Sequence, residues 1–148
     1  MTIRTITAAN SVFMLTVGAL YPTPQKLGGF MADDVFDTDD VEISETVMGV
    51  DNNLSVGYIP NPVEQNIAIM PDSPTSDLFD AWYAAQLAAR EVIVCSASIW
   101  LPGPQKKYAC VKGVLKRTKP IPSVKKVVQG VVYRLTWQSI LPVPYTPV

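Results

Sequence analysis

The sequence predicts a mainly β fold of the α+β class: an antiparallel β-sandwich or barrel of about seven strands with one flanking α-helix at about residues 74–90. Only residues 70–91 place apolar side chains at helical spacing, and the other segments are short, alternating and separated by turn residues. A chain of 148 residues can bury a core of its own. We therefore expect one domain over residues 1–148, with an N-terminal arm at 1–10 and an extended, proline-rich C-terminal tail at 141–148.

The segments before the helix are expected to be strands and loops. Residues 11–20 predict a strand that ends at the two prolines of residues 21–24. Residues 33–40 are acidic and poor in apolar side chains, which is typical of a loop. Residues 41–59 predict a long hairpin, because the turn at 51–53 consists of residues that tolerate positive φ between two alternating stretches.

The helix has a clear start and one apolar face. Ser73 can cap its N-terminus, and Pro74 suits the first helical position, where a missing N–H is harmless. Leu78 and Trp82 fall on one face with Phe79 at its edge, so we expect this face to pack on a sheet.

The segments after the helix predict a hairpin of residues 92–101 and 106–116, and then a strand at 131–138. Cys95 and Cys110 lie about equally far from the turn of this hairpin, which would set them nearly opposite each other. Because we see no export signal, we expect free, buried thiols and no disulfide.

Composition excludes several classes of function. The chain has no histidine, which removes the usual general base and the usual zinc ligand. The acidic cluster at 37–40 does not match a calcium loop, because Val41 and Glu42 stand where an oxygen ligand and the turn glycine are needed. No apolar run approaches the ~18 residues of a membrane span. We expect no enzyme activity, no cofactor, no metal site and no membrane partner.

Charge is strongly segregated along the chain. All thirteen acidic residues lie within 33–91, whereas 92–148 carries nine Lys or Arg and no acid. The two sets could pair within the fold, or they could meet across subunits and fix the register of self-assembly. Leu87, on the polar side of the helix, could be a lone exposed apolar residue or a subunit contact. The candidates for contacts between subunits are Asp33, Asp34, Asp37, Asp39, Asp40, Lys119, Lys125, Lys126 and Leu87.

Two short motifs and the order of elements resemble a known family. The strand IAIM at 67–70 runs into DSPTSDL at 72–78, and a hairpin follows MGVD at 48–51. With strands, helix and strands in this order across most of the chain, the sequence resembles a bacteriophage tail tube protein, most closely the short tube proteins of contractile tails. Asn52 stands where such proteins often have glycine, which leaves the turn type open.

The resemblance implies a structural virion protein of the tail, assembled in the cytoplasm of the bacterial host. Such proteins are usually β-sandwiches that form hexameric rings, in which strands of every subunit join an inner barrel. Stacked rings conduct DNA during ejection, with a tape-measure protein inside the tube and a sheath protein around it in a contractile tail. Closing a ring also removes exposed strand edges.

A tube that passes DNA quickly needs a neutral or acidic lining, because phosphates bind tightly to a basic wall. The hairpin at 41–59 has one polar face, and we expect Glu42, Ser44 and Thr46 to line the lumen while Val41 and Ile43 face the core. The alternative is an ordinary solvated outer wall.

Three other functions are weighed against the tube. The ring protein of a bacterial secretion tube, such as that of type VI systems, cannot be separated from a phage or tailocin tube by sequence. A nucleic-acid-binding β-domain could use a basic track of Lys106, Lys107, Lys112, Lys116, Arg117, Lys119, Lys125 and Lys126. A small enzyme could use the paired carboxylates Asp33 and Asp34, but both lie in an expected loop without a partner base.

Overall fold

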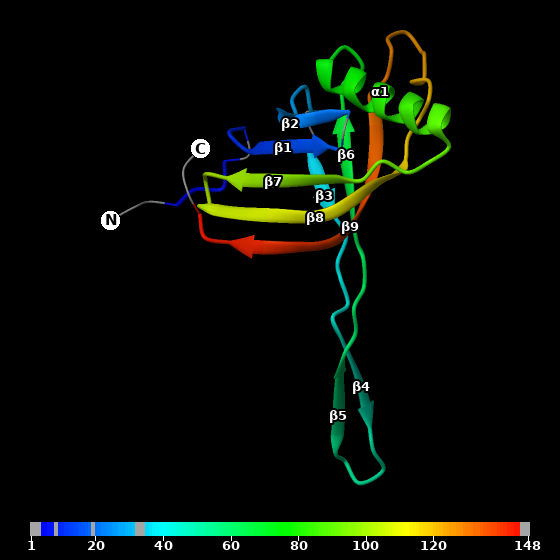
Figure 1. Ribbon diagram of the computed structural model, residues 1–148. Helices are drawn as coiled ribbons and strands as arrows, with labels where there is room; N and C mark the ends of the chain where they lie inside the picture. Colours follow the sequence, from blue (N-terminus) through cyan, green and yellow to red (C-terminus); the bar gives the residue numbers. More distant parts are fainter. Residues whose placement is uncertain (1–3, 8, 19, 32–34, 146–148) are drawn as a thin grey trace.

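The computed structural model describes residues 4–7, 9–18, 20–31 and 35–145, and it shows a mainly β domain with one helix in this part of the chain (Figure 1). The elements in chain order are β1 Val12–Val17, β2 Tyr21–Lys26, β3 Phe36–Thr38, β4 Ser44–Met48, β5 Leu54–Tyr58, β6 Val63–Ile69, α1 Pro74–Ala89, β7 Cys95–Leu101, β8 Lys106–Arg117 and β9 Val131–Val143. Seven strands form one antiparallel sheet in the order β2-β1-β7-β8-β9-β6-β3, and β4 and β5 form a separate hairpin. The predicted fold class is confirmed.

The seven-stranded sheet curls until its two ends meet. Four strands separate β1, which carries Phe13, from β3, which carries Phe36, in the sheet order, yet the two rings make an edge-to-face contact with centroids 5.5 Å apart. After β2, Phe30 forms a bridge to Ile69 of β6, and the Met31 N–H donates to the Ala68 carbonyl at 3.1 Å. The sheet is therefore close to a barrel, with its core on the concave side.

Alternate residues of the strands fill this core. The buried side chains include Phe13, Leu15, Val17, Ile67, Ile69, Ile99, Tyr133, Leu135 and Trp137. Trp137 packs over Gly113, where an added Cβ would lie 2.3 Å from the indole ring. Its Nε1–H donates to Oε1 of the buried Gln65 at 3.0 Å, so the polar group inside the core has a partner.

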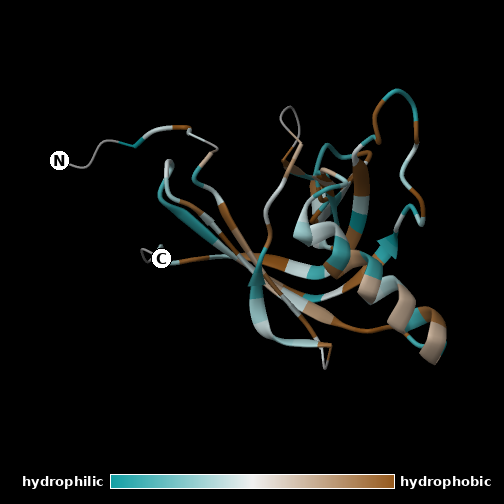
Figure 2. Ribbon diagram, turned by 90° about the horizontal axis from the view of Figure 1, so that it is seen from above, coloured by the Kyte–Doolittle hydropathy of each residue, from teal (hydrophilic) through white to brown (hydrophobic). Residues whose placement is uncertain are grey.

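Helix α1 begins as the sequence predicts and lies across the ends of β6 and β9 (Figure 1); Figure 2 shows the domain from above. The Ser73 hydroxyl accepts from the Thr75 N–H at 3.2 Å and donates to the Gly28 carbonyl at 2.9 Å. Gly29 has φ +67°, and any Cβ there would collide with Ser73. Phe79 stacks on Tyr133 of β9 with ring centroids 4.2 Å apart, which fixes the apolar face of the helix on the sheet.

Three boundaries differ from the sequence analysis. Residues 21–24, expected to end a strand, belong to β2, which is an edge strand and therefore tolerates two prolines. Residues 36–38, expected in a loop, form β3. β9 runs on to Val143, into the segment assigned to the C-terminal tail, and Pro142 lies opposite Tyr108 of β8. Beyond β8 this half of β9 has no further neighbour in the sheet, so the missing N–H of proline costs little.

Cys95 and Cys110 are free and buried, as expected. They are close but not opposite, because Cys110 pairs with Ala97, and Cys95 with Gly113 across a bulge in β7 and β8. Burial raises the pKa of both thiols to about 12.

Candidate assembly surfaces

The hairpin β4–β5 is held by a compact turn at its tip. The Gly49 N–H donates to the Asn53 carbonyl at 2.8 Å, and Asn52 adopts φ +66°, so the positive φ expected of this turn is present. The Asp51 carboxylate accepts from the Asn53 backbone and side chain, which lowers the pKa of Asp51. These contacts set the register, with Met48 opposite Leu54.

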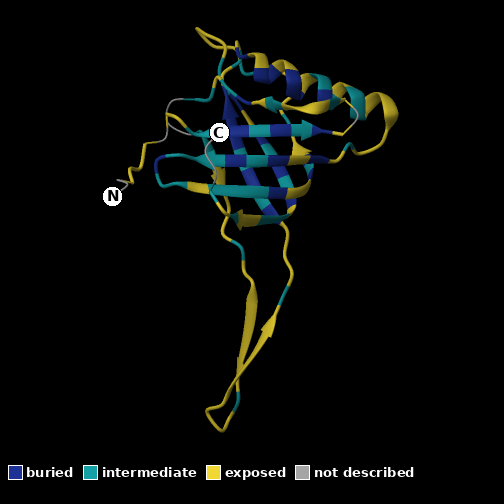
Figure 3. Cartoon of the chain, turned by 60° about the vertical axis from the view of Figure 1, so that its left-hand side comes forward, coloured by how far each residue is buried: buried dark blue, intermediate teal, exposed yellow. Residues whose placement is uncertain are grey.

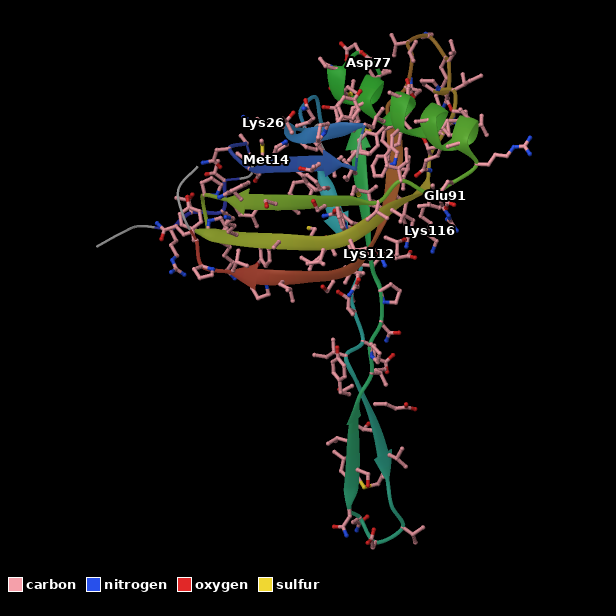
Figure 4. All side chains as sticks on the ribbon, viewed as in Figure 1. Met14, Lys26, Asp77, Glu91, Lys112 and Lys116 are labelled. Carbon is pink, nitrogen blue, oxygen red and sulfur yellow. The ribbon has the colours of Figure 1, made fainter. Side chains whose placement is uncertain are left out.

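The hairpin projects from the body, and every residue of both its strands is exposed (Figure 3). Its side chains extend on both sides along its length (Figure 4). The exposed apolar residues are Ile43, Val47, Met48, Val50, Leu54, Val56 and Tyr58, each between 55% and 107% exposed. So large an apolar surface on a thin projection is typical of a contact with another protein.

The two faces of the hairpin differ from the expected polar and apolar sides. Ser44 pairs with Tyr58 and Thr46 with Val56, so the face expected to be polar also carries the apolar side chains of β5. Ile43, expected to face the core, is 64% exposed, whereas Val41 packs against the core. The expectation that the second face covers the core is therefore wrong beyond Val41, because the strands leave the body there.

A groove of about 500 Å³ lies where the hairpin joins the sheet. Val41, Ile43, Tyr58 and Ile59 line it from the hairpin side, and Ile99, Leu101, Tyr108 and Ile140 line it from the sheet. Residues 41–43 and 59–62, which join the hairpin strands to the sheet, form a neck. Its two segments are tied by a hydrogen bond from the Ile59 N–H to the Ile43 carbonyl at 3.1 Å and by one from Asn61 Nδ2 to the Glu42 carbonyl at 2.8 Å. Sequence patterns do not reveal this groove, because the residues that line it are far apart in the chain.

Acidic side chains from the first part of the chain and basic side chains from the second part pair in one cluster around β6 and β9. The Glu64 carboxylate accepts from Lys116 of β8, labelled in Figure 4, and from Arg134 of β9. Arg134 also donates to Asp39 at 2.6 Å. The hydrogen bond from Lys116, then that from Arg134, lowers the pKa of Glu64. Some of the segregated acidic and basic side chains therefore pair within one chain. Lys116 is one of them, so its charge is already balanced and it contributes less to the basic track considered for nucleic acid.

The segment 118–130 between β8 and β9 forms a loop at the same end of the molecule as α1 (Figure 1). It carries the three exposed candidates Lys119, Lys125 and Lys126 and no acid. Its exposed apolar residues are Ile121, Val124, Val127 and Val128, each between 46% and 73% exposed. The loop thus carries only positive charges and exposes apolar side chains. The hairpin likewise exposes apolar side chains, but its charges are all negative.

The remaining candidates lie apart from these surfaces. Asp37 and Asp40 are exposed next to the neck, and Asp33 and Asp34 lie outside the described residues. Leu87 is 65% exposed beside Tyr83 and Val92 in a shallow hollow on the outer side of α1.

The described residues hold no cluster of three or more metal-ligating side chains. Among them, no helix has the length and apolar character that crossing a bilayer requires.

The family model described as tail fiber protein gp32 matches residues 4–141, which is nearly the whole chain. No curated protein matches the sequence.

Solved structures share the fold at low sequence identity. A chain of the cryo-EM structure of an extracellular contractile injection system, the PVC sheath-tube complex in its extended state, gives a TM-score of 0.59 at 13% identity, covering 89% of this chain and 88% of that one. A chain of the 6-fold symmetrised anti-feeding prophage baseplate gives a TM-score of 0.54 at 12% identity, and the match covers 97% of this chain and 95% of that one. A chain of the anti-feeding prophage cap, which terminates the tube, gives a TM-score of 0.50 at 11% identity, and the match covers 97% of this chain and 92% of that one. The folds similar to this chain therefore occur in an extracellular contractile injection system and in the anti-feeding prophage.

Proposed function

Because the chain belongs to the family described as tail fiber protein gp32, it is a structural tail component, and we propose that it forms the inner tube of a contractile tail. In this proposal the copies close into rings, hexameric as in the tube proteins the sequence resembles, and the rings stack around a lumen that conducts DNA. A sheath protein surrounds the tube, and a tape-measure protein and then DNA pass through it. Assembly takes place in the cytoplasm of the bacterial host.

The uncovered hairpin β4–β5 carries the proposal. A two-stranded hairpin standing alone in water is at best marginally stable, and this one also exposes seven large apolar side chains. Packing against further copies would cover that surface. The similarity to a chain of a sheath-tube complex supports copies of the same chain as the partner.

The hairpin also supports the proposed lumen lining of Glu42, Ser44 and Thr46. Their face is not mainly polar, but residues 41–59 contain no Lys or Arg, and that is the property a DNA conduit requires. In a structure of the assembled tube, we expect these three side chains to point to the axis. A hairpin on the outer wall, or a bore lined by Lys106 to Lys126, would contradict the assignment.

Negative-stain microscopy and light scattering of the purified full chain test the tube. We expect rings and tubes of uniform diameter whose amount rises with protein concentration. A monodisperse monomer at high concentration and moderate salt would overturn the proposal, because a tube protein must self-assemble.

A tail fibre or baseplate component is the second candidate, favoured by the printed description of the family and by the match to a chain of a baseplate. Such a protein would form one defined oligomer without stacking. The same microscopy separates the two, since a fibre or baseplate protein gives particles of fixed size and a tube protein gives particles of variable length.

A further inference from the structure

We propose that the groove at the neck binds residues 144–148 of a second copy, the proline-rich segment that follows β9. The contact rests on the proposed function, because it requires that copies of the chain assemble with one another.

The groove is suited to an apolar segment without charge. The described residues that line it include no charged side chain. Three aromatic rings contribute to its walls, Phe36 from β3, Tyr58 from the hairpin and Tyr108 from β8, and Tyr58 is 81% exposed. The two tyrosine hydroxyls and the amide of Gln138 can donate hydrogen bonds to backbone carbonyls. An aromatic-lined groove of this kind is what an extended, proline-rich segment binds.

The end of the sequence matches these properties. Residues 141–148, LPVPYTPV, contain three prolines and no charged residue. Prolines favour the extended polyproline II conformation, so little conformational entropy is lost when the segment is ordered. Because proline has no N–H, the segment mainly presents carbonyl acceptors, which the donors of the groove can satisfy.

Other exposed segments of the chain match the groove less well. The loop 118–130 carries lysines, and the tip of the hairpin carries Asp51. The arm at residues 4–7 carries Arg4 and is tied to the turn after β7, because the Thr5 N–H donates to the Gly103 carbonyl at 3.0 Å. The segment after β9 is therefore the one that fits by charge and by conformation.

This segment would need a sharp reversal to enter the groove of its own chain. Strand β9 lines the groove with residues 138–140 and runs on to Val143, about 10 Å beyond Ile140 at roughly 3.3 Å per residue. Pro144 restricts Val143 to an extended conformation, which opposes a tight turn there. The chain also leaves the end of β9 on the side away from the hairpin (Figure 1). The groove that the segment can enter is therefore that of a neighbouring copy.

Engineered cysteines test the contact in the full chain. An Ile43→Cys, Thr146→Cys double variant places one thiol on the wall of the groove and one on the segment, and it keeps Tyr145 and all three prolines. Mild oxidation of the assembled protein should give covalent dimers, trimers and longer products on a non-reducing gel. Each single variant should give no product beyond the dimer. Background cross-linking should be low, because both native thiols are buried.

Val132→Cys with Thr146→Cys is the matched control, since Val132 is 53% exposed on β9 but does not line the groove. It should give no product beyond the dimer. A double variant of Ile43 and Thr146 that cross-links only within the monomer would assign the groove to the segment of the same chain and overturn the inference.

A labelled peptide of residues 141–148 gives an independent arm. Fluorescence anisotropy should show saturable binding to the full chain carrying Tyr145→Ser, whose own segment competes less. Adding Ile43→Glu should weaken this binding by roughly tenfold or more, because the uncharged peptide would have to cover a carboxylate. Val132→Glu should leave the binding unchanged. Equal binding by the two charged variants would contradict the inference.

The two proposals fail in different ways. Tubes that form without cross-linking between Ile43→Cys and Thr146→Cys would overturn this contact alone. Wild-type protein that stays monomeric at high concentration would overturn the proposed function and this contact with it.

Discussion

The hairpin face of Ile43 and Val47 gives the sharpest quantitative prediction. The two side chains are 64% and 63% exposed in the single chain. Full burial of such a side chain stabilises a contact by about 1.5–3 kcal/mol, so covering the exposed parts of both contributes about 2–4 kcal/mol. Ile43→Ser with Val47→Ser should therefore raise the protein concentration needed for assembly by between roughly 30-fold and several hundred-fold.

Sedimentation of tubes over a concentration series measures this threshold. The melting temperature of the unassembled double variant should stay near that of the wild type, because neither side chain belongs to the core. Val132→Ser is the control, since Val132 is 53% exposed on β9, away from the hairpin. An unchanged threshold in the double variant, or an equal rise in the control, would refute the reasoning.

Three further predictions concern the stability of the single chain. Gly113→Ala should destabilise the fold by about 1–3 kcal/mol in a denaturant titration, because the new methyl group overlaps the Trp137 ring; a midpoint equal to wild type would show that the ring can move freely. Gln65→Leu should cost about 1–3 kcal/mol, since it leaves the buried Trp137 Nε1–H without its acceptor, and a more stable variant would contradict this hydrogen bond. Between pH 9 and about 12 the thiols of the unfolded chain ionise while Cys95 and Cys110 stay protonated in the fold, so stability should fall over that range. In Cys95→Ala with Cys110→Ala the alkaline decline should be shallower, and an equal decline would assign it to other groups.

The sequence predicts best where structure depends on nearby residues. The start of α1 follows from Ser73 and Pro74, whose effects are confined to one turn of helix. The strand at 131–138 follows from its alternation, and its buried side chains are those expected. The effect of the prolines at 22 and 24 cannot be predicted locally, because it depends on whether a neighbouring strand exists, which is a property of the whole sheet.

The exposed faces of the hairpin are harder to predict, because the alternation of apolar and polar residues in a strand does not show whether other residues cover either face. Val47 alternates as a core residue would, yet its strand has left the body and its side chain is 63% exposed. The pairing of Ser44 with Tyr58 depends on the turn length at 49–53, so the composition of each hairpin face could not be read from one strand. Likewise, the sequence does not show that Asp39 pairs within its own chain, because its partner Arg134 is 95 residues away.

The neck between the hairpin and the sheet has a mechanical consequence. It consists of two single segments held by few hydrogen bonds, whereas the body is cross-linked by a seven-stranded sheet and a packed core. A load on the hairpin tip is therefore taken up by torsion of the neck before any core side chain moves. In the proposed tube, such a neck would let the hairpin move relative to the barrel while the core keeps its packing, and a substitution at residues 59–62 would change that freedom without altering the barrel.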